Sequence, residues 1–488
     1  MSNSKQRKQV LVYVFVAISS LLMALNAKTL TLDAGSTGTD SSVFIYVANM
    51  ILDGEMPYLH TFDHKGPVLY LINAAGLLIS RQTGIWLLEL ITILITFTFA
   101  YKIARLLGCR EISACMVVAI SALVLNYYFE GGNLVEEYAC VFLTISLYLF
   151  LRFFITSQIK VWELMLCGAS FATVLLLRVN MVVLWAVMCV GVLVFNIKNG
   201  FSQKTIGFIL WFLLGVALVC IPIMVWLWYN QALIPFVDNY LLFNLKYMSD
   251  ANTASVGTVV RAIAHFSVGS PMVVTIPILV YFCLYKNSII DWLCLVALGL
   301  SVLSMGLSGR VYAHYGMILY PLVVYAISRA SAGLDEKMSE VNVRRKVARA
   351  VSSLCVVILL LENPIQLMAK NILSIPQVLD AKTQWHEIAE VVRDNTEEDA
   401  RISVCGNKNV IYLLSDRKSA SKYSYQTPIA TICPEIKEEY LADIRKLKAE
   451  MIIMSDDIIF YDDIMEFVEQ EYTLIDIVGS THIFLKNK

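Results

Sequence analysis

Long apolar runs, separated by short polar segments, fill the first three quarters of the chain. A helix needs about 20 apolar residues to cross the hydrocarbon core of a bilayer, and runs of that kind recur many times. We predict about eleven such spans. They lie near Val10–Thr29, Gly84–Leu106, Glu111–Tyr127, Leu134–Phe153, Val161–Leu177, Met181–Ile197, Thr205–Tyr229, Ala264–Tyr285, Ile289–Leu307, Tyr315–Ser328 and Ala348–Leu361. The pattern is typical of an all-α polytopic membrane protein.

A long polar loop, residues 30–83, separates the first predicted span from the second. Within it, Phe44, Val47, Ala48 and Ile51 follow the i, i+3, i+4, i+7 spacing of one helix face. A short amphipathic helix of this kind suits the membrane surface better than a crossing. A second helix is expected over Pro67–Ser80, because proline favours the first helical position.

The last part of the chain, residues 374–488, has a different pattern of short apolar runs and amphipathic segments. We predict strands at Arg401–Cys405, Met451–Met454, Thr473–Val478 and Thr481–Leu485, with helices at Glu435–Lys448 and Asp462–Glu471. This predicts a small α/β domain, long enough to bury its own core, after a transmembrane domain at residues 1–363. It carries no G-x-G-x-x-G or phosphate loop, so nucleotide binding has no support.

Composition excludes a soluble globular protein, since 58% of the 488 residues are hydrophobic and only 16% are charged. From Ser374 onward the chain has 21 acidic and 13 basic residues, whereas the rest has 18 acidic and 25 basic residues. Most of those 25 lie at predicted inner ends and loops when the N-terminus is cytoplasmic. We therefore predict a multi-pass plasma-membrane protein with an extracytoplasmic C-terminal domain. Nothing in the charge pattern suggests nucleic-acid binding.

The first apolar run follows Lys5, Arg7 and Lys8 and lacks a clear cleavage site, so we expect it to stay as a signal-anchor helix. The 11 cysteines show no metal-ligand spacing. Cys405 and Cys433 in the tail are either two buried thiols or a disulfide.

Ionisable residues gather at the predicted outer ends of the helices. They are Asp40, Asp63, His64 and Lys65 in the first loop, Glu130, Glu136 and Glu137 before the fourth span, Arg178 after the fifth, and Arg310, His314 and Tyr315 before the tenth. Such groups are costly near a membrane and usually have a partner or a function. Four separate loops thus place acids and bases on one side of the membrane.

The first-loop motifs are an Asp-Ser pair, A-x-x-I-x-x-G, Pro-Tyr and D-x-K-G-P-x-x-Y. They resemble the first extracytoplasmic loop of bacterial GT-C glycosyltransferases, the protein mannosyltransferase-like group (family 39) that includes the aminoarabinose transferases. The resemblance implies inverting transfer of a sugar from a polyprenyl-phosphate donor to an extracytoplasmic glycan or lipid acceptor. That reaction needs a carboxylate as base and cations for the leaving phosphate.

The resemblance also implies residue roles. Asp40 matches the general base, although an N-cap carboxylate is the simpler alternative. Lys65, Arg178 and Arg310 match donor phosphate-binding cations, although Lys65 could instead orient the loop or be an ordinary lysine at the membrane interface. The candidates for acceptor or metal binding are Glu136, Glu137, Asp63, His64, His314 and Tyr315. For both histidines a structural hydrogen bond is an equally good interpretation. No cofactor is required, and a divalent metal ion is left open.

The chain departs from the family pattern in two ways. Ser41 stands where many relatives carry a second acid, and no folded domain interrupts the middle loops. The second difference favours a glycan or wall-polymer acceptor over a protein. Rival interpretations are a lipid-linked glycan transporter or flippase, a polysaccharide polymerase or ligase, and a non-catalytic scaffold.

Overall fold

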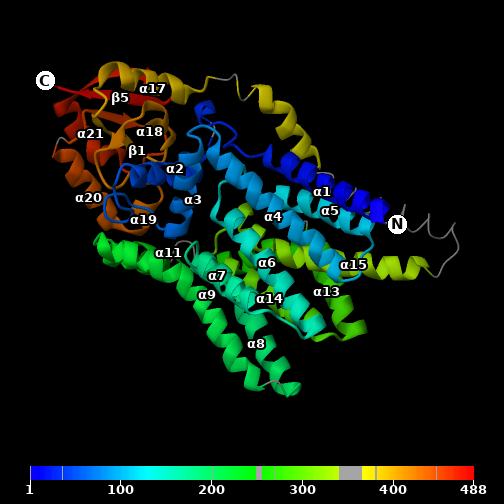
Figure 1. Cartoon of the computed structure of the whole chain (residues 1–488). Helices are drawn as coiled ribbons and strands as arrows, with labels where there is room; N and C mark the ends of the chain where they lie inside the picture. The colour runs from blue at the N-terminus through cyan, green and yellow to red at the C-terminus, as the bar shows by residue number, and fades with distance from the viewer. Residues whose placement is uncertain are drawn as a thin grey trace. The chain divides into compact units, whose positions relative to one another are not determined.

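The structure, a computed structural model, divides into two compact units that we describe separately (Figure 1). It describes residues 2–35, 37–200, 202–248, 255–269, 271–339, 365–377, 379, 382–446 and 448–487. The first unit comprises Met1–Ala27, Leu88–Ile223 and Ala251–Leu373, and the second comprises Lys28–Leu87, Met224–Asp250 and Ser374–Lys488. The second unit therefore combines the first loop with the tail.

The first unit is helical. Its helices are α1 (Ser2–Ala24), α4 (Gly84–Leu106), α5 (Glu111–Tyr128), α6 (Val135–Thr156), α7 (Val161–Leu175), α8 (Val183–Lys198), α9 (Ser202–Tyr229), α12 (Val256–Val268), α13 (Met272–Lys286), α14 (Ile289–Gly306) and α15 (Tyr320–Ser339), with short η2 (Val179–Met181) and η4 (Ala313–Leu319). Within the described residues, seven helices are long and apolar enough to cross a membrane, or up to eight if a bent pair counts as one. The chain is thus a multi-pass membrane protein.

The predicted spans differ from these helices in three places. The eighth, Ala264–Tyr285, was predicted as one helix, but the chain bends by 74° between α12 and α13. Gly269 and Pro271 lie at this bend, and neither residue type favours a helix interior. Helices α7 and α8 have 15 and 16 residues, fewer than a full crossing needs. The eleventh predicted span, Ala348–Leu361, lies outside the described residues.

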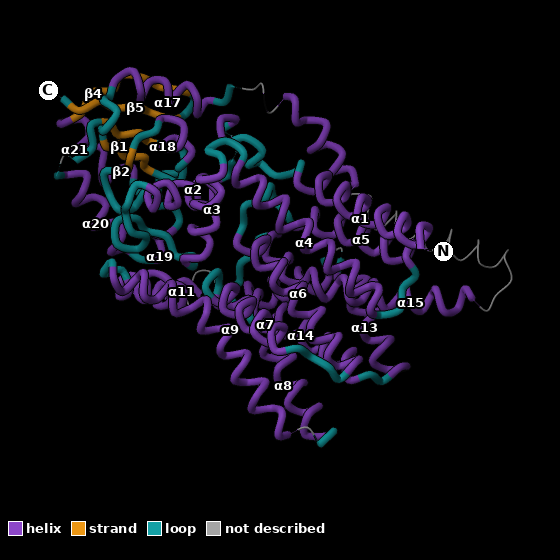
Figure 2. The backbone as a smooth tube through the Cα atoms, viewed as in Figure 1, coloured by secondary structure: helices purple, strands orange, loops and turns teal. Residues whose placement is uncertain are grey.

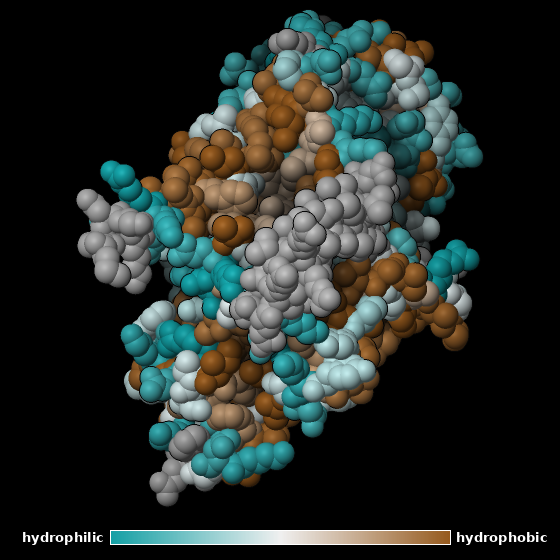
Figure 3. Space-filling model, turned by 90° about the vertical axis from the view of Figure 1, so that its right-hand side faces the viewer, coloured by the Kyte–Doolittle hydropathy of each residue, from teal (hydrophilic) through white to brown (hydrophobic). Residues whose placement is uncertain are grey.

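Exposed apolar side chains support the membrane assignment. In the most apolar stretch of α9 only 6% of the residues are buried, and the exposed residues of this helix include Ile209, Leu218 and Ile221. Hydrophobic side chains also cover much of the surface shown in Figure 3. A helix that is apolar on its exposed sides is stable in hydrocarbon rather than in water.

The second unit contains a sheet. The first loop supplies η1 (Leu32–Ala34), α2 (Thr39–Leu52) and α3 (Pro67–Ile79), and the middle segment supplies α10 (Leu233–Phe236), the π-helical η3 (Val237–Leu242) and α11 (Phe243–Met248). The tail supplies α17 (Gln384–Asn395), β1 (Arg401–Cys405), α18 (Val410–Ser415), β2 (Lys418–Ser419), α19 (Ile429–Ile432), α20 (Pro434–Arg445), β3 (Met451–Met454), α21 (Tyr461–Glu471), β4 (Tyr472–Val478) and β5 (Thr481–Lys486). Of the described residues, strands are confined to this tail (Figure 2).

The strand order is β2-β1-β3-β5-β4. Strand β1 runs parallel to β2 and β3, with Ile402 opposite Met451, and β5 is antiparallel to both β3 and β4. The predicted α/β class of the tail is confirmed, and β1 and β3 have the predicted bounds. Strand β3 is an apolar run that is buried throughout, and β1 is buried from Ile402 to Cys405, as is typical of strands inside a parallel sheet.

Helix α2 does not lie on a membrane surface, so that prediction is wrong. Tyr46 and Met50 belong to the same buried cluster as Ile402 and Ile453 of the sheet. The Tyr46 hydroxyl also accepts a 2.9 Å hydrogen bond from the backbone N–H of Ser419. The helix is apolar on nearly all sides, and such a helix is stable when it is buried in a core.

Candidate functional site

The loop between α2 and α3 holds most of the first-loop residues named above. We call Tyr58, Asp63, His64, Lys65, Tyr70 and Tyr425 the first-loop cluster. Pro57 bridges Thr61, and the Tyr58 N–H donates to the Thr61 carbonyl over 2.8 Å, so the loop folds back on itself. Pro67 occupies the first turn of α3, as predicted. These contacts fix the segment that carries the ionisable residues.

Asp63 is buried and accepts three hydrogen bonds. The backbone N–H of His64 and the hydroxyl of Tyr425 donate to Oδ1 over 2.7 and 2.8 Å, and the hydroxyl of Tyr70 donates to Oδ2 over 2.8 Å. Burial raises the pKa of Asp63, while Lys65 and these donors oppose the rise. Three donors directed at one carboxyl are suited to its ionised form. Asp63 is thus enclosed and poorly placed to reach a substrate.

His64 connects Asp63 to Lys65. Its Nε2 lies 2.8 Å from Lys65 Nζ, and its Nδ1 lies 3.4 Å from Asp63 Oδ1. An ammonium group can only donate, so Nε2 accepts and the ring proton belongs on Nδ1, facing the carboxylate. Asp63 and His64 together therefore hold the partly buried ammonium group of Lys65 in a defined place.

The middle segment of the second unit contacts the same loop. Asn244 donates to the His64 carbonyl over 2.6 Å, and Asn239, on the π-helical turn, donates to the Tyr58 carbonyl over 3.1 Å. The His64 ring stacks on Tyr247 and lies against Phe243, with centroids 5.1 and 5.4 Å apart. Sequence reasoning missed these residues, because no motif in residues 230–250 identifies them.

Asp40 has the opposite environment to Asp63. It lies in the first turn of α2 and is exposed, and the N-cap residue is Gly38 rather than Asp40. Among the described residues, no hydrogen bond or ion pair engages its carboxylate. Its charge does reach Tyr425, whose pKa is raised well above its usual value by burial, then Asp63, and then Asp40. Asp40 is therefore an exposed carboxylate without a polar partner in the described part of the chain.

In the first unit, the turn before α6 has an unusual backbone. Glu130, Gly131, Gly132 and Asn133 all have positive φ, between 47° and 98°. Glu130 Oε2 lies 2.5 Å from His314 Nδ1, and this hydrogen bond is the main cause of a lowered pKa for Glu130. The turn thus brings a carboxylate to the histidine just before the predicted tenth span, and His314 has the structural hydrogen bond that we considered.

Arg178, Glu136 and Tyr315 lie together in the first unit. Arg178 Nη1 is 2.5 Å from Glu136 Oε1, and its guanidinium lies over the Tyr315 ring, 4.3 Å from the centroid. Burial alone would lower the pKa of Arg178, but Tyr315 and Glu136 raise it. Arg310 is near enough for the charge of Arg178 to contribute, after burial, to its lowered pKa. Arg178 thus influences Arg310 electrostatically, and Glu136 is already paired with Arg178.

Glu137 points to a different partner. Its carboxylate is buried and interacts with the buried Glu89 of α4, which accepts a 2.5 Å hydrogen bond from the Asn133 N–H. Glu89 was not predicted, because a single acid inside an apolar run carries no motif. Among the described residues, no three His, Cys, Asp or Glu side chains are gathered as metal ligands. The residues present thus do not form a protein-only metal cage, and we derive no step through a metal.

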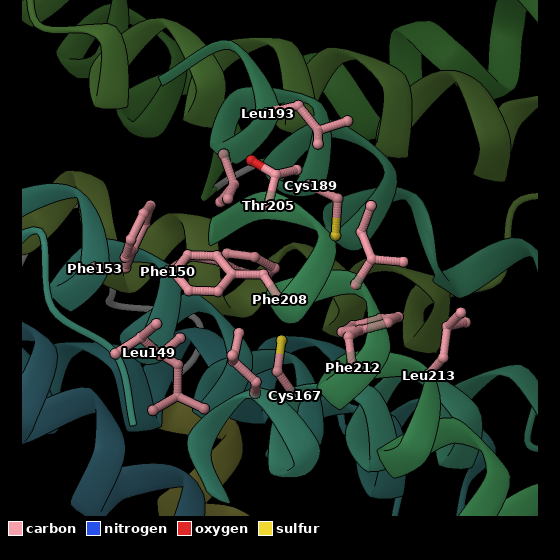
Figure 4. A pocket seen from close by; sticks show the side chains of 14 residues that line it. Leu149, Phe150, Phe153, Cys167, Cys189, Leu193, Thr205, Phe208, Phe212 and Leu213 are labelled. Carbon is pink, nitrogen blue, oxygen red and sulfur yellow. The ribbon is translucent and has the colours of Figure 1, made fainter. Parts of the chain in front are cut away.

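An apolar pocket of about 220 Å³ lies elsewhere in the first unit (Figure 4). Its 14 lining residues come from α6 to α9 and from the loop before α7, and they include Phe150, Cys167, Cys189 and Phe208. Thr205 brings the one hydroxyl group of this lining. Both cysteines are free thiols, and so are Cys405 and Cys433. A pocket this apolar suits hydrocarbon and offers nothing to a phosphate or sugar.

Two solved structures of ArnT from Cupriavidus metallidurans resemble the whole chain. The structure bound to undecaprenyl phosphate matches 96% of this chain and 97% of ArnT at 12% identity, with a TM-score of 0.61. The apo structure matches 98% of each chain at 12% identity, with a TM-score of 0.62. These matches confirm the predicted GT-C fold.

An oligosaccharyltransferase from Archaeoglobus fulgidus in complex with Zn and sulfate matches 90% of this chain and 67% of its own length. Its identity is 13% and its TM-score is 0.49. No curated protein matches the sequence. Residues 2–376 match the family Competence-induced Ccs4, N-terminal domain. The chain therefore belongs to the Ccs4 family of competence-induced proteins.

Proposed function

We propose that the chain is a membrane glycosyltransferase that moves one sugar from a polyprenyl-phosphate carrier to a glycan, polymer or lipid acceptor outside the cell. The observation that carries the proposal is the full-length fold match to ArnT in its undecaprenyl phosphate complex. The family name itself describes no chemistry. In this proposal the N-terminus is cytoplasmic and the C-terminal domain is extracytoplasmic.

The proposed reaction is a direct displacement at the anomeric carbon. The acceptor oxygen forms the new bond as the bond to the phosphate oxygen breaks, which inverts the anomeric configuration. Asp40 takes the acceptor proton, because it is the first-loop carboxylate that is exposed and has neither a hydrogen bond nor an ion pair among the described residues. Asp63 and Glu136 are less suitable, since three donors enclose one and Arg178 pairs with the other.

The leaving phosphate gains negative charge, which cations stabilise. The proposed cations are Lys65, Arg178 and Arg310. The phosphate-binding role of each residue is considered separately, and a variant of that residue tests it. Glu136 and the Tyr315 ring fix the Arg178 guanidinium.

The direct test is transfer of labelled sugar by the purified chain in nanodiscs, using polyprenyl phosphates that carry different sugars. Arg178→Lys keeps the charge but loses the planar fork, so we expect the KM for the donor to rise about tenfold. Arg81→Lys is the matched control, because Arg81 forms an exposed ion pair with Asp416. Absence of both transfer and hydrolysis with every donor would contradict the proposal. Tight binding of lipid-linked glycans without turnover would indicate a transporter.

A further inference from the structure

The first-loop cluster contains one side chain that comes from the far end of the chain. Tyr425 lies in the tail, between β2 and α19, and its side chain is only 4% exposed. Its hydroxyl donates to Asp63 Oδ1 over 2.8 Å and lies 3.4 Å from His64 Nδ1. Tyr425 and Asp63 are 362 positions apart in the sequence. No first-loop motif could have indicated this contact.

The segment around Tyr425 is held at several points. Gln426 exchanges hydrogen bonds with Gly406 at the end of β1, its N–H donating over 3.0 Å and its Oε1 accepting over 2.9 Å. The Lys422 carbonyl accepts a 2.7 Å hydrogen bond from the N–H of Phe62. The contacts with the end of β1 and with Phe62 of the first loop therefore hold the backbone around Tyr425 in place, and this positions its hydroxyl.

Asp63 depends on this hydroxyl. A buried carboxylate is costly unless donors satisfy it, and Asp63 has only two donors besides Tyr425 among the described residues, the Tyr70 hydroxyl and the His64 N–H. Asp63 in turn faces the protonated Nδ1 of His64, whose Nε2 accepts from Lys65. The chain of contacts thus runs from the tail to the ammonium group of Lys65.

We propose that Tyr425 is a positioning residue, which acts through Asp63 and His64 to hold the Lys65 ammonium group in place for the donor phosphate. The role of Lys65 rests on the proposed function, but the coupling between Tyr425 and Lys65 does not. In this proposal the C-terminal domain contributes the Tyr425 side chain to the first-loop cluster.

The test compares Tyr425→Phe, Asp63→Asn and the double variant with the wild type. Tyr423→Phe is the matched control, since its hydroxyl donates to the partly exposed Glu439 instead. The first readout is the acylation rate of the Lys65 amine, measured by mass spectrometry against exposed Lys382 in the same molecule. The second readout is kcat and donor KM for sugar transfer.

We expect Tyr425→Phe to raise the acylation rate of Lys65 and to raise the donor KM about ten- to hundredfold, the range for a lost hydrogen bond to a charged group. The fall in kcat should be smaller, and Tyr423→Phe should behave as wild type. Because Tyr425 acts through Asp63, adding Tyr425→Phe to Asp63→Asn should change neither readout further.

Additive effects in the double variant would overturn the proposal, and so would an unchanged Lys65 acylation rate in Tyr425→Phe. If Tyr425→Phe does not fold, an unchanged Lys65 acylation rate in Asp63→Asn overturns it equally. Should the wild type transfer no sugar, the proposed function fails, while the acylation rates still decide whether Tyr425 positions Lys65.

Discussion

Two carboxylates of the same loop differ in what surrounds them, and this difference is the reason for proposing Asp40 rather than Asp63 as the base. Asp63 is enclosed by three donors, whereas Asp40 is exposed in the first turn of α2. The sequence motifs identified both residues but could not distinguish an enclosed acid from an available one. The donors to Asp63 include a tail residue, and its distance along the chain hides the contact from any local pattern.

Glu130 provides a pH-dependent test at the residue scale. Its pKa is lowered chiefly by its hydrogen bond with His314, so it stabilises the fold above the ordinary glutamate range, about 4.3. That contribution is lost as pH falls through the lowered pKa. The side chain is 44% exposed, so the effect should stay below about 1 kcal/mol.

We therefore expect Glu130→Gln to unfold at a lower temperature than wild type at pH 7, with the difference shrinking below about pH 4. Thermal unfolding in detergent across this pH range measures it. A difference that stays constant or grows on acidification would show that Glu130 acts other than through its charge.

At the scale of elements, the sequence predicted what depends on local pattern. Strands β1 and β3 have the predicted bounds, because short apolar runs between polar residues have few alternatives. The location of α2, on a membrane surface or in a protein core, could not be predicted in this way. Its apolar positions fit either a membrane surface or a protein core, and only the tail, more than 300 residues later, supplies the partner side chains.

The four-residue turn before α6 is another element that tertiary contacts determine. At Gly132, where φ is +80°, a Cβ would lie 2.2 Å from Glu89 Oε1 and 2.8 Å from the Phe129 ring. We expect Gly132→Ala to lower the free energy of unfolding by about 1 to 3 kcal/mol. Gly108→Ala is the control, since Gly108 has φ +98° but no atom within 4 Å. Equal losses in thermal unfolding would mean that backbone strain alone, not the contact with Glu89, sets the cost.

At the scale of the whole molecule, the second unit is assembled from three separate parts of the chain. Its sheet shares a core with Tyr46 and Met50 of α2, and its β2 strand donates to the Tyr46 hydroxyl. The tail was expected to bury its own core, and the structure shows that this core also includes residues of the first loop. The first loop and the C-terminal sheet are therefore stabilised together.

We expect residues 374–488 expressed alone to be markedly less stable than the same segment expressed together with residues 28–87. Without α2, the cluster that contains Ile402 and Ile453 is open to water on one side. Hydrogen exchange of β1 and α18 measures the difference. Equal protection with and without the first-loop segment would show that α2 adds nothing to the domain.

The central claim is that Asp40 is the base of a sugar transfer. The most direct measurement compares Asp40→Asn with wild type in the transfer assay with polyprenyl-phosphate donors. Asp53→Asn serves as control, because Asp53 lies at the other end of α2 in an exposed ion pair with Lys418. We predict a loss of at least about a hundredfold for Asp40→Asn and little change for Asp53→Asn. Equal transfer by Asp40→Asn and wild type would contradict the account and would make Glu136 and Glu137 the next candidates for the base.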